Sequence, residues 1–421
     1  MQSGKSGEVP LLLGMPLEKG RWVLVVVGLI INLCLGAVYS WSIFVNPLID
    51  YFSINLGQNV TTNDVLLPYS VILAVFSVTM ALSGKYVETY GPRKITILGC
   101  ILTGLGWLFA STVSSPSMLS LMYGVIGGIG IGIAYGATVA VAARWFPDRR
   151  GLAVGLIVFG VGFSALITAN LAGYLIAAYG VMGTFQIFGI GIIIVTVPLA
   201  LPLAFPPVGW KPAGWTPPLP GAEEHVTCEC DRSEMVKTTA FYGLWMCYFI
   251  ACIAGLMAVS ISKPVGTELM QIGTGLATAL VGFFAIFNGG GRLVFGVLTD
   301  RLNPRNTAML TFVLIALASL AMWQVPGIEV YIIAFAVLWG CLGGWLAIAP
   351  TATASYFGTC DYPRCYGVVF LAFGAGAIAG PQLAGFIRTT TGNYSGVFPW
   401  GFILAIIGFI VAYFLMKPPK Q

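Results

Sequence analysis

The chain has 421 residues, of which 58% are hydrophobic and only 8% are charged, and its mean hydropathy is +0.91. Soluble domains are about one-quarter charged and about half apolar, so this chain lacks the charge needed to solvate an aqueous surface. The composition indicates an integral membrane protein. It excludes a secreted disulfide scaffold, a cytosolic enzyme and a nucleic-acid-binding protein. The nine cysteines lie mostly in apolar runs and are interpreted as small hydrophobic residues.

Twelve apolar runs along the chain are long enough to cross a bilayer as a helix, which takes about 20 residues. We expect these spans at about 22–46, 66–83, 95–114, 118–142, 151–178, 183–205, 241–262, 274–295, 307–324, 329–350, 366–386 and 396–416. A stretch rich in proline, glycine and charge follows the sixth span and predicts a connector. The sequence therefore predicts an all-α membrane protein with an N-terminal half at 1–205, a linker loop at 206–238 and a C-terminal half at 239–421.

Positive charges gather on one side of these spans. With both termini in the cytoplasm, 17 of the 20 Lys and Arg residues fall on the cytoplasmic side, Lys263 and Arg388 on the outer side, and Arg292 inside a span. Such a bias sets the orientation of membrane proteins. We therefore expect a multi-pass protein of the plasma or inner membrane with both termini in the cytoplasm, and we interpret the net charge as a topology signal.

The two halves of the chain repeat each other. The segment Gly84–Arg93 recurs as Gly296–Arg305, and the pattern Phe159–Gly162 recurs as Phe373–Gly376. The offset between the copies is nearly constant, which is typical of transporters built from two structural repeats. The pattern predicts two six-helix pseudo-repeats.

The loop at 84–94 resembles the signature between the second and third helices of the major facilitator superfamily. Within that superfamily, residues 38–47 and 144–152 resemble the oxalate:formate antiporter group. Asn288-x-x-x-Arg292 resembles that group and its relatives, the monocarboxylate transporters. The resemblance covers the whole chain. It implies the twelve-helix major facilitator fold and secondary transport of a small organic anion.

Arg292 is the one charged residue that we expect well inside a span, where ionisable groups are expensive. A buried guanidinium without a buried carboxylate needs a counter-ion, and a small organic anion would supply one through two parallel hydrogen bonds. The alternative is that Arg292 extends to the cytoplasmic edge, because Asp300 and Arg301 follow two turns later.

Asn288 lies one helical turn before Arg292 on the same helix face. Its amide is expected to orient the guanidinium or to bond the substrate, and a plain helix–helix hydrogen bond is the alternative. The three glycines between them, at 289–291, would let a neighbouring helix or a substrate approach the backbone. Packing alone is an equally good interpretation of these glycines.

Four aromatic residues with a polar tip are further candidates for substrate binding. Tyrosines at positions matching Tyr39 and Tyr135 contact the bound dicarboxylate in the oxalate transporter family, so the resemblance implies the same role here. Without it, Tyr39 would be an interfacial residue and Tyr135 a core residue. Trp345 in the tenth span is a cavity candidate, for which core packing is the alternative, and Trp339 shares both interpretations.

Phe373 marks a departure from the oxalate transporter pattern, which places a second cation, a lysine, in helix eleven. A dianion facing Arg292 alone would carry an excess buried charge, which costs several kcal/mol in a dry site. The sequence therefore favours a monocarboxylate such as lactate, pyruvate, formate or acetate.

Several other features limit the function. The sequence has no Walker A loop, so we expect no ATP-driven step, and it has no embedded His or paired carboxylates of the kind an enzyme would need. No cofactor is expected. The motif His225-x-x-Cys228-x-Cys230 lacks a fourth ligand, so we expect no zinc site. Asn59 and Asn393 begin glycosylation sequons on expected outer loops.

The alternatives to a monocarboxylate transporter are an oxalate:formate exchanger and a transport-dead sensor. Coupling stays open between proton co-transport and anion exchange, because no carboxylate or histidine is embedded and Asn288 stands where relatives have Asp. The expected partners are the small organic anion, protons if transport is proton-coupled, and the lipid bilayer. No nucleic acid is expected, and the protein is expected to act as a monomer.

Overall fold

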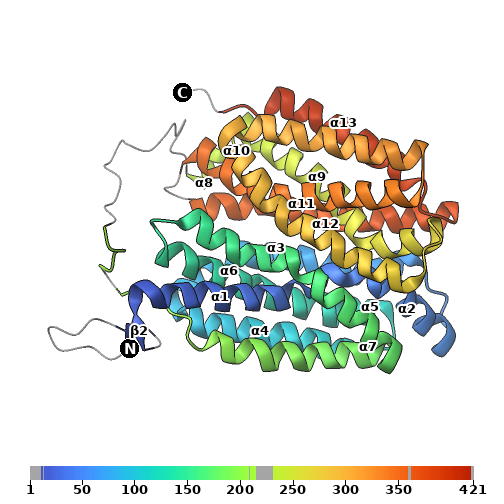
Figure 1. Cartoon of the computed structure of the whole chain (residues 1–421), viewed down its shortest axis with the longest axis horizontal. Coiled ribbons are helices and arrows are strands. Elements are labelled where there is room, and N and C mark those ends of the chain that lie inside the picture. The colour runs from blue at the N-terminus through green and yellow to red at the C-terminus, as the bar shows by residue number, and fades with distance from the viewer. Residues whose placement is uncertain (1–10, 13, 208, 215–230, 359–361, 419–421) are drawn as a thin grey trace.

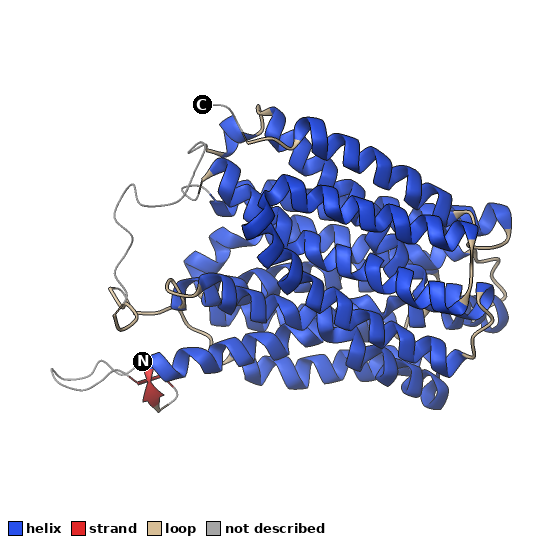
Figure 2. Ribbon diagram, turned by 45° about the horizontal axis from the view of Figure 1, so that its top comes forward, coloured by secondary structure: helices blue, strands red, loops and turns tan. Residues whose placement is uncertain are grey.

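The computed structural model describes residues 11–12, 14–207, 209–214, 231–358 and 362–418. Helices dominate it, and they run side by side in one bundle (Figures 1 and 2). α1 begins and α13 ends at the same end of the bundle (Figure 1). We call this the terminal end and the opposite one the outer end.

In chain order the elements are β1 (Leu11–Leu12), β2 (Met15–Pro16), α1 (Leu17–Leu35), η1 (Gly36–Ile43), α2 (Val45–Asp50), η2 (Tyr51–Asn55), α3 (Thr62–Tyr90), α4 (Pro92–Ala110), α5 (Pro116–Leu119), η3 (Ser120–Gly127), α6 (Gly128–Trp145), α7 (Arg150–Ala200), α8 (Arg232–Met235), α9 (Thr239–Pro264), η4 (Val265–Leu269), α10 (Thr274–Gln324), α11 (Ile328–Phe357), α12 (Tyr362–Thr391) and α13 (Val397–Leu415). The strands β1 and β2 form a small antiparallel pair that the sequence analysis did not predict. η1 is a 3₁₀ helix, and η2, η3 and η4 are π-helical turns.

Ten of the described helices are long and apolar enough to cross a membrane. Two of them, α7 and α10, have 51 residues each and contain a residue with a non-helical backbone, Gly180 (φ 73°) and Asn303 (φ 66°). Each is therefore two spans joined at a sharp corner, which gives twelve. Glycine adopts positive φ without strain, and Pro304 disfavours the helical conformation for the residue before it. The predicted all-α class with twelve spans is confirmed.

Several helices begin before the predicted apolar runs, because capping residues set their first turns, whereas α4 and α7 end a few residues short of the predicted ends. α3, for example, begins four residues earlier than expected, where Thr61 and Asp64 form a reciprocal capping box. α4 begins with Pro92 in its first turn, directly after Gly91 at φ 84°. Hydropathy locates the apolar middle of a span, and these local hydrogen bonds decide where it ends.

The N-terminal helices and the C-terminal helices form two layers that lie side by side (Figure 1). The most extensive contacts between them are those of α3 with α12, α7 with α10, and η1 with α9. The Ser77 hydroxyl of α3 donates to the Phe370 carbonyl of α12 at 2.8 Å. The predicted boundaries at 205 and 238 stay a prediction.

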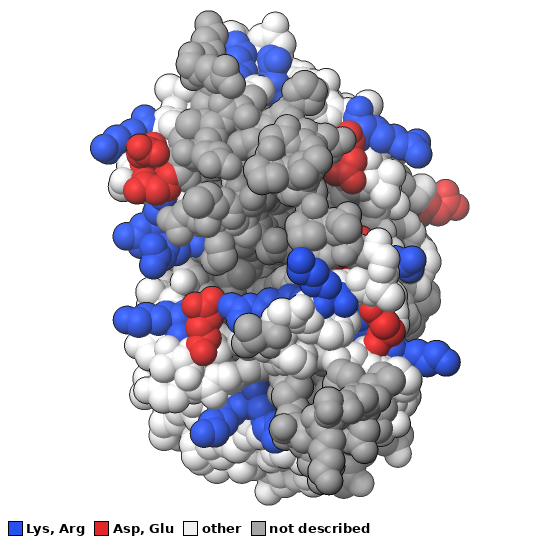
Figure 3. Space-filling view, turned by 90° about the vertical axis from the view of Figure 1, so that its left-hand side faces the viewer, with Lys and Arg blue, Asp and Glu red and all other residues white. Residues whose placement is uncertain are grey.

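The terminal end carries a group of Lys and Arg side chains around its face, with Asp and Glu among them (Figure 3). This distribution agrees with the side that the sequence assigns to the cytoplasm, and the orientation itself stays a prediction.

The seventh span, predicted at 241–262, extends further along the chain in the structure. The structure places Lys263 inside α9, and only 8% of the residue is exposed. The helical conformation continues through Pro264 into η4, so the chain does not leave the bundle where the apolar run ends.

Candidate functional site

Arg292 lies in the first part of α10 and is held by groups from two helices. One guanidinium nitrogen, Nη1, donates to the carbonyl of Val158 in α7, and Nη2 donates to Asn288 Oδ1 at 3.3 Å. The Asn288 amide in turn donates to the carbonyl of Trp339 in α11 at 3.1 Å. Asn288 therefore orients the guanidinium and also makes the helix–helix hydrogen bond that was the alternative, and its bonding to a substrate stays a prediction.

The charge of Arg292 has no counter-ion in the described part of the chain. The residue is 6% exposed, its Nε has no hydrogen-bond partner there, and no described carboxylate lies within 4.0 Å of the guanidinium. The two acceptors it does have are neutral oxygens. A buried cation with neutral partners keeps most of its electrostatic attraction for an anion.

Glycines allow the backbones of neighbouring helices to pack closely around Arg292. Gly291 packs against the backbone of Gly340, and Gly343 against the backbone of Asn288, so α10 and α11 touch main chain to main chain. Gly289 faces the ring of Phe159, and Gly290 has free space on its side-chain side. Close helix packing is thus what Gly289 and Gly291 serve in this structure.

Gly162 of α7 is a site residue that the sequence analysis recorded only as part of a repeat. A Cβ at this position would lie 2.7 Å from Asn288 Oδ1 and 3.0 Å from Arg292 Nε. The absence of a side chain at Gly162 leaves the room in which the Arg292–Asn288 pair lies. The Phe-Gly-x-Gly repeat was the available signal, but it does not reveal which helix faces the glycine.

A small cavity lies next to the guanidinium, and its volume of about 10 Å³ leaves room for about one water molecule. Its lining consists of four residues from N-terminal helices and four from C-terminal helices: Tyr39, Phe76, Tyr135, Val161, Arg292, Leu346, Phe370 and Phe373. The Tyr39 hydroxyl lies next to the guanidinium and interacts with it. The structure thus brings together four predicted site residues, Arg292, Tyr39, Tyr135 and Phe373, with Asn288 directly behind the guanidinium.

Much of the cavity lining is aromatic. Phe373 stacks on Phe370 with ring centroids 5.1 Å apart, and Phe76 meets Tyr135 edge-on at 5.3 Å and Phe373 at 5.9 Å. Phe76 and Phe370 were missed by the sequence analysis. The available signal for Phe370 was its position one helical turn before Phe373. Apolar walls of this kind lower the local dielectric and strengthen the pull of the guanidinium on an anion.

Trp345 is not part of this lining. Its indole nitrogen donates to the Thr311 hydroxyl at 3.0 Å, and its ring stacks on Tyr248 at 5.9 Å, so it packs within the C-terminal half. Trp339 also lies outside the lining, and its indole donates to the Ser262 hydroxyl at 2.9 Å. For both residues the structure shows the core packing that was the alternative interpretation.

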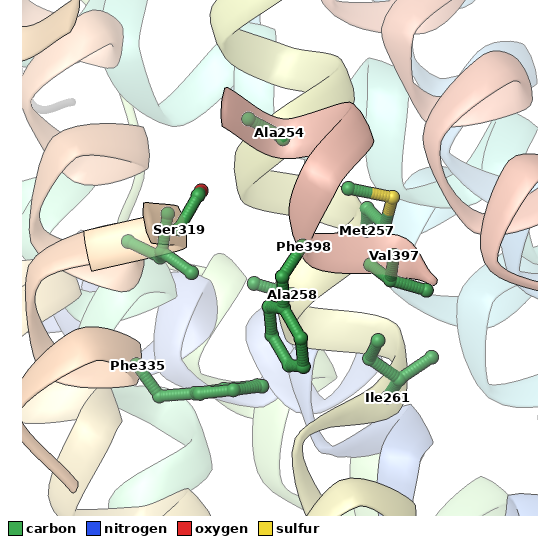
Figure 4. A pocket seen from close by; sticks show the side chains of 10 residues that line it. Ala254, Met257, Ala258, Ile261, Ser319, Phe335, Val397 and Phe398 are labelled. Carbon is green, nitrogen blue, oxygen red and sulfur yellow. The ribbon is translucent and has the colours of Figure 1, made fainter. Parts of the chain in front are cut away.

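A second pocket lies between α9, α10, α11 and α13 and is apolar (Figure 4). Phe335, Phe398, Met257 and Ile261 face it, and the Ser319 hydroxyl is the polar side-chain group among its described lining residues. It offers no charge to an anion. The described residues include no group of three or more metal-ligating side chains, and the His225 motif lies outside the described residues.

Two helical halves that enclose a buried cation and a small cavity at their interface define the class of secondary transporters. The family model of the Major Facilitator Superfamily matches residues 28–358 and 244–421. The chain therefore belongs to the Major Facilitator Superfamily and is a multi-pass membrane transporter by family and fold.

The chain is similar in sequence to named transporters of the superfamily. The chain is 28% identical to the oxalate:formate antiporter of Oxalobacter formigenes, over 100% of this chain and 97% of that protein. It is 23% identical to monocarboxylate transporter 9 of Rattus norvegicus, over 93% and 91%.

The fold is similar to that of solved transporters. A D-xylose-proton symporter matches with a TM-score of 0.71 at 14% identity, covering 95% of this chain and 98% of that one. A bacterial homolog of the human lysosomal transporter Spinster, in an inward-facing and occupied conformation, matches with a TM-score of 0.69 at 16% identity, covering 94% and 97%. At such identities the likeness concerns the fold alone.

Proposed function

We propose that the chain is a secondary active transporter of small monocarboxylates of the lactate, pyruvate, formate or acetate type. The observation that carries this proposal is the lone positive charge of Arg292 among the described residues that line the cavity. A carboxylate binds a guanidinium through two parallel hydrogen bonds, and one monoanion neutralises one guanidinium. The cavity, at about 10 Å³, is too small to hold a carboxylate in this conformation, so its lining must move apart to admit the substrate.

The two halves would carry the substrate by rocking around this cavity. Four lining residues come from each half, and the bond from Arg292 to the Val158 carbonyl crosses between the halves. An incoming carboxylate competes with that carbonyl for the guanidinium. Binding would therefore loosen a contact between α7 and α10, which is how a substrate can favour the change of conformation. We propose boundaries at 205 and 238 for the moving halves and a cytoplasmic terminal end.

Two coupling modes fit a cavity whose described lining holds no carboxylate and no histidine. In the first, the substrate crosses together with a proton, which the substrate itself brings. In the second, one anion is exchanged for another. In both modes Asn288 acts as a fixed hydrogen-bonding group rather than as a proton carrier, because an amide does not titrate.

Exchange of oxalate for formate is the second candidate. It is supported by the similarity to the Oxalobacter antiporter over the whole chain and by the presence of Tyr39 and Tyr135 at the cavity. The single cation weighs against it, because a second carboxylate would face Phe373 and Phe370 without a partner.

The experiment is uptake by proteoliposomes that contain the full-length protein. Labelled lactate is offered with unlabelled lactate inside, with an inward proton gradient, or with neither, and labelled oxalate is offered with formate inside. We expect lactate uptake above empty liposomes. Stimulation by internal lactate alone indicates exchange, and stimulation by the proton gradient indicates co-transport. Uptake of oxalate with no uptake of any monocarboxylate would establish the second candidate instead.

A further inference from the structure

Lys263, another buried cation without a described carboxylate partner, lies where the two halves meet at the outer end of the bundle. Its ammonium has three hydrogens to donate, and its described contact is a single long hydrogen bond of 3.5 Å to the carbonyl of Ile43. No described carboxylate lies within 4.0 Å of it. Only 8% of the residue is exposed, so the charge is both desolvated and poorly paired. Such an arrangement costs free energy unless a counter-ion binds to it.

Lys263 lies beyond the Arg292 cavity along the line of the bundle. Ile43 ends η1, four residues after the cavity residue Tyr39, and a 3₁₀ helix rises about 2 Å per residue. The contact is therefore about 8 Å further toward the outer end than Tyr39. Side chains on an α-helix lean toward its N-terminus, which for α9 is the direction of the cavity.

A chain of hydrogen bonds joins this end of α9 to the anion site. Ser262, the neighbour of Lys263, accepts from the indole of Trp339 at 2.9 Å, and the Trp339 carbonyl accepts from Asn288, which holds Arg292. The end of α9 that carries Lys263 is thus fixed in position relative to the guanidinium.

We propose that Lys263 is an outer anion-binding position for the carboxylate substrate. When the halves separate at the outer end, the ammonium leaves the Ile43 carbonyl, receives a carboxylate from the medium and passes it inward to Arg292. When they close, Ile43 takes the place of the anion and excludes it. The two cations then act one after the other on a single negative charge, so the outer cation does not turn the cavity into a dianion site. The inference rests on the proposed function and on an outer end that faces the medium.

The test compares Lys263→Gln, Lys263→Arg and Arg388→Gln in proteoliposomes of known orientation, with labelled lactate offered from each side. Arg388 is the matched control, because it is another cation of the outer end and its guanidinium is already paired with Glu268 at 2.9 Å. We expect Lys263→Gln to raise the KM from the outer side about tenfold, as charges that focus a ligand into a cleft do, with kcat changed less than about twofold. The KM from the terminal side stays as in wild type, and Lys263→Arg and Arg388→Gln behave like wild type from both sides.

Three results would overturn the inference. One is an outer KM of Lys263→Gln equal to that of wild type. Another is an equal rise in KM from both sides, which would show a general structural role. The third is a Lys263→Arg variant that folds, by size-exclusion chromatography, and is as defective as Lys263→Gln. If wild type carries no carboxylate at all, the proposed function itself fails, and this outcome is distinct from the other three.

Discussion

Arg292 is held between two halves of the protein by neutral oxygens, one from Asn288 on its own helix and one from Val158 on α7. The spacing of Asn288 and Arg292 was readable in the sequence, because residues four apart on a helix face each other. The Val158 carbonyl and the room left by Gly162 were not, since both depend on how α7 packs against α10. A single sequence holds no information on which carbonyl of another helix a side chain will reach.

Replacing Arg292 tests whether transport depends on the two parallel hydrogen bonds that its planar guanidinium can donate. Lysine at this position keeps the charge but loses the two parallel hydrogen bonds to a carboxylate, so we expect Arg292→Lys to lower lactate transport by at least about tenfold, equivalent to about 1.4 kcal/mol. The measurement is initial uptake into proteoliposomes at matched protein density. Arg292→Ala with wild-type transport would contradict the central role of this residue.

Gly162→Ala tests the space beside the pair. The added methyl group would lie within 3.0 Å of both Asn288 Oδ1 and Arg292 Nε, so the amide and guanidinium must shift. We expect a several-fold rise in the KM for lactate in a protein that still folds. Gly155→Ala is the control on the same helix, since a Cβ there meets no atom within 4 Å. Equal KM values for the two variants would count against this arrangement.

At the scale of elements, the chain's apolar runs predicted the twelve spans, and local hydrogen bonds and helix corners decided their ends. Gly180 and Asn303 divide α7 and α10 into two spans each, and the predicted gaps between spans include both residues. The continuation of α9 past Lys263 was not predictable from hydropathy, because a helix does not end where its apolar residues end. Partners that are far apart in sequence, such as Arg21 and Asp148, were not predictable either.

We expect the contact of α1 with the loop between α6 and α7 to depend on pH. Burial by itself would raise the pKa of the Asp148 carboxyl, but the hydrogen bonds and positive charge of Arg21, at 2.7 and 3.1 Å, outweigh it and hold the pKa below its usual value. The unfolded carboxyl binds its proton more readily than the folded one. The stabilisation is therefore fully present above about pH 4, the usual pKa of Asp, and is lost as pH falls through the lower folded value.

Asp148→Asn should accordingly lower the melting temperature of the detergent-solubilised protein by a few degrees at pH 7. The difference from wild type should shrink as the pH falls below about 4. Thermal unfolding followed by tryptophan fluorescence at both pH values is the measurement. A difference between the proteins that is independent of pH would show that the ion pair is not the cause.

At the scale of the whole molecule, the cavity lies where two repeats meet, and its charge is set by which positions of the repeats carry a cation. The repeated Phe-Gly-x-Gly pattern places Phe373 in α12 at the position that corresponds to Phe159 in α7. Phe373 lies in the lining, whereas Phe159 packs on Gly289 behind it. The two halves are thus similar in backbone and different in what they offer a substrate. The sequence shows the repeat, and only the packed structure shows which copy faces the cavity.

The proposed preference for a monoanion rests on this asymmetry, and we expect one substitution to shift it. Phe373 is fully buried in the lining with Arg292, and Phe373→Lys would put a second cation in the same cavity. Two cations facing one carboxylate leave an unpaired buried charge, so we expect weaker binding of lactate. A dianion would pair with both, so oxalate should gain relative to lactate by about tenfold, or about 1.4 kcal/mol.

The measurement is the inhibition constant of oxalate against labelled lactate, in proteoliposomes, for wild type and Phe373→Lys. Phe373→Leu is the control for the lost aromatic contacts with Phe370 and Phe76, and it should leave the ratio of the two affinities unchanged. A wild type that already prefers oxalate, or a ratio that moves equally in both variants, would show that the number of cations does not set the preference.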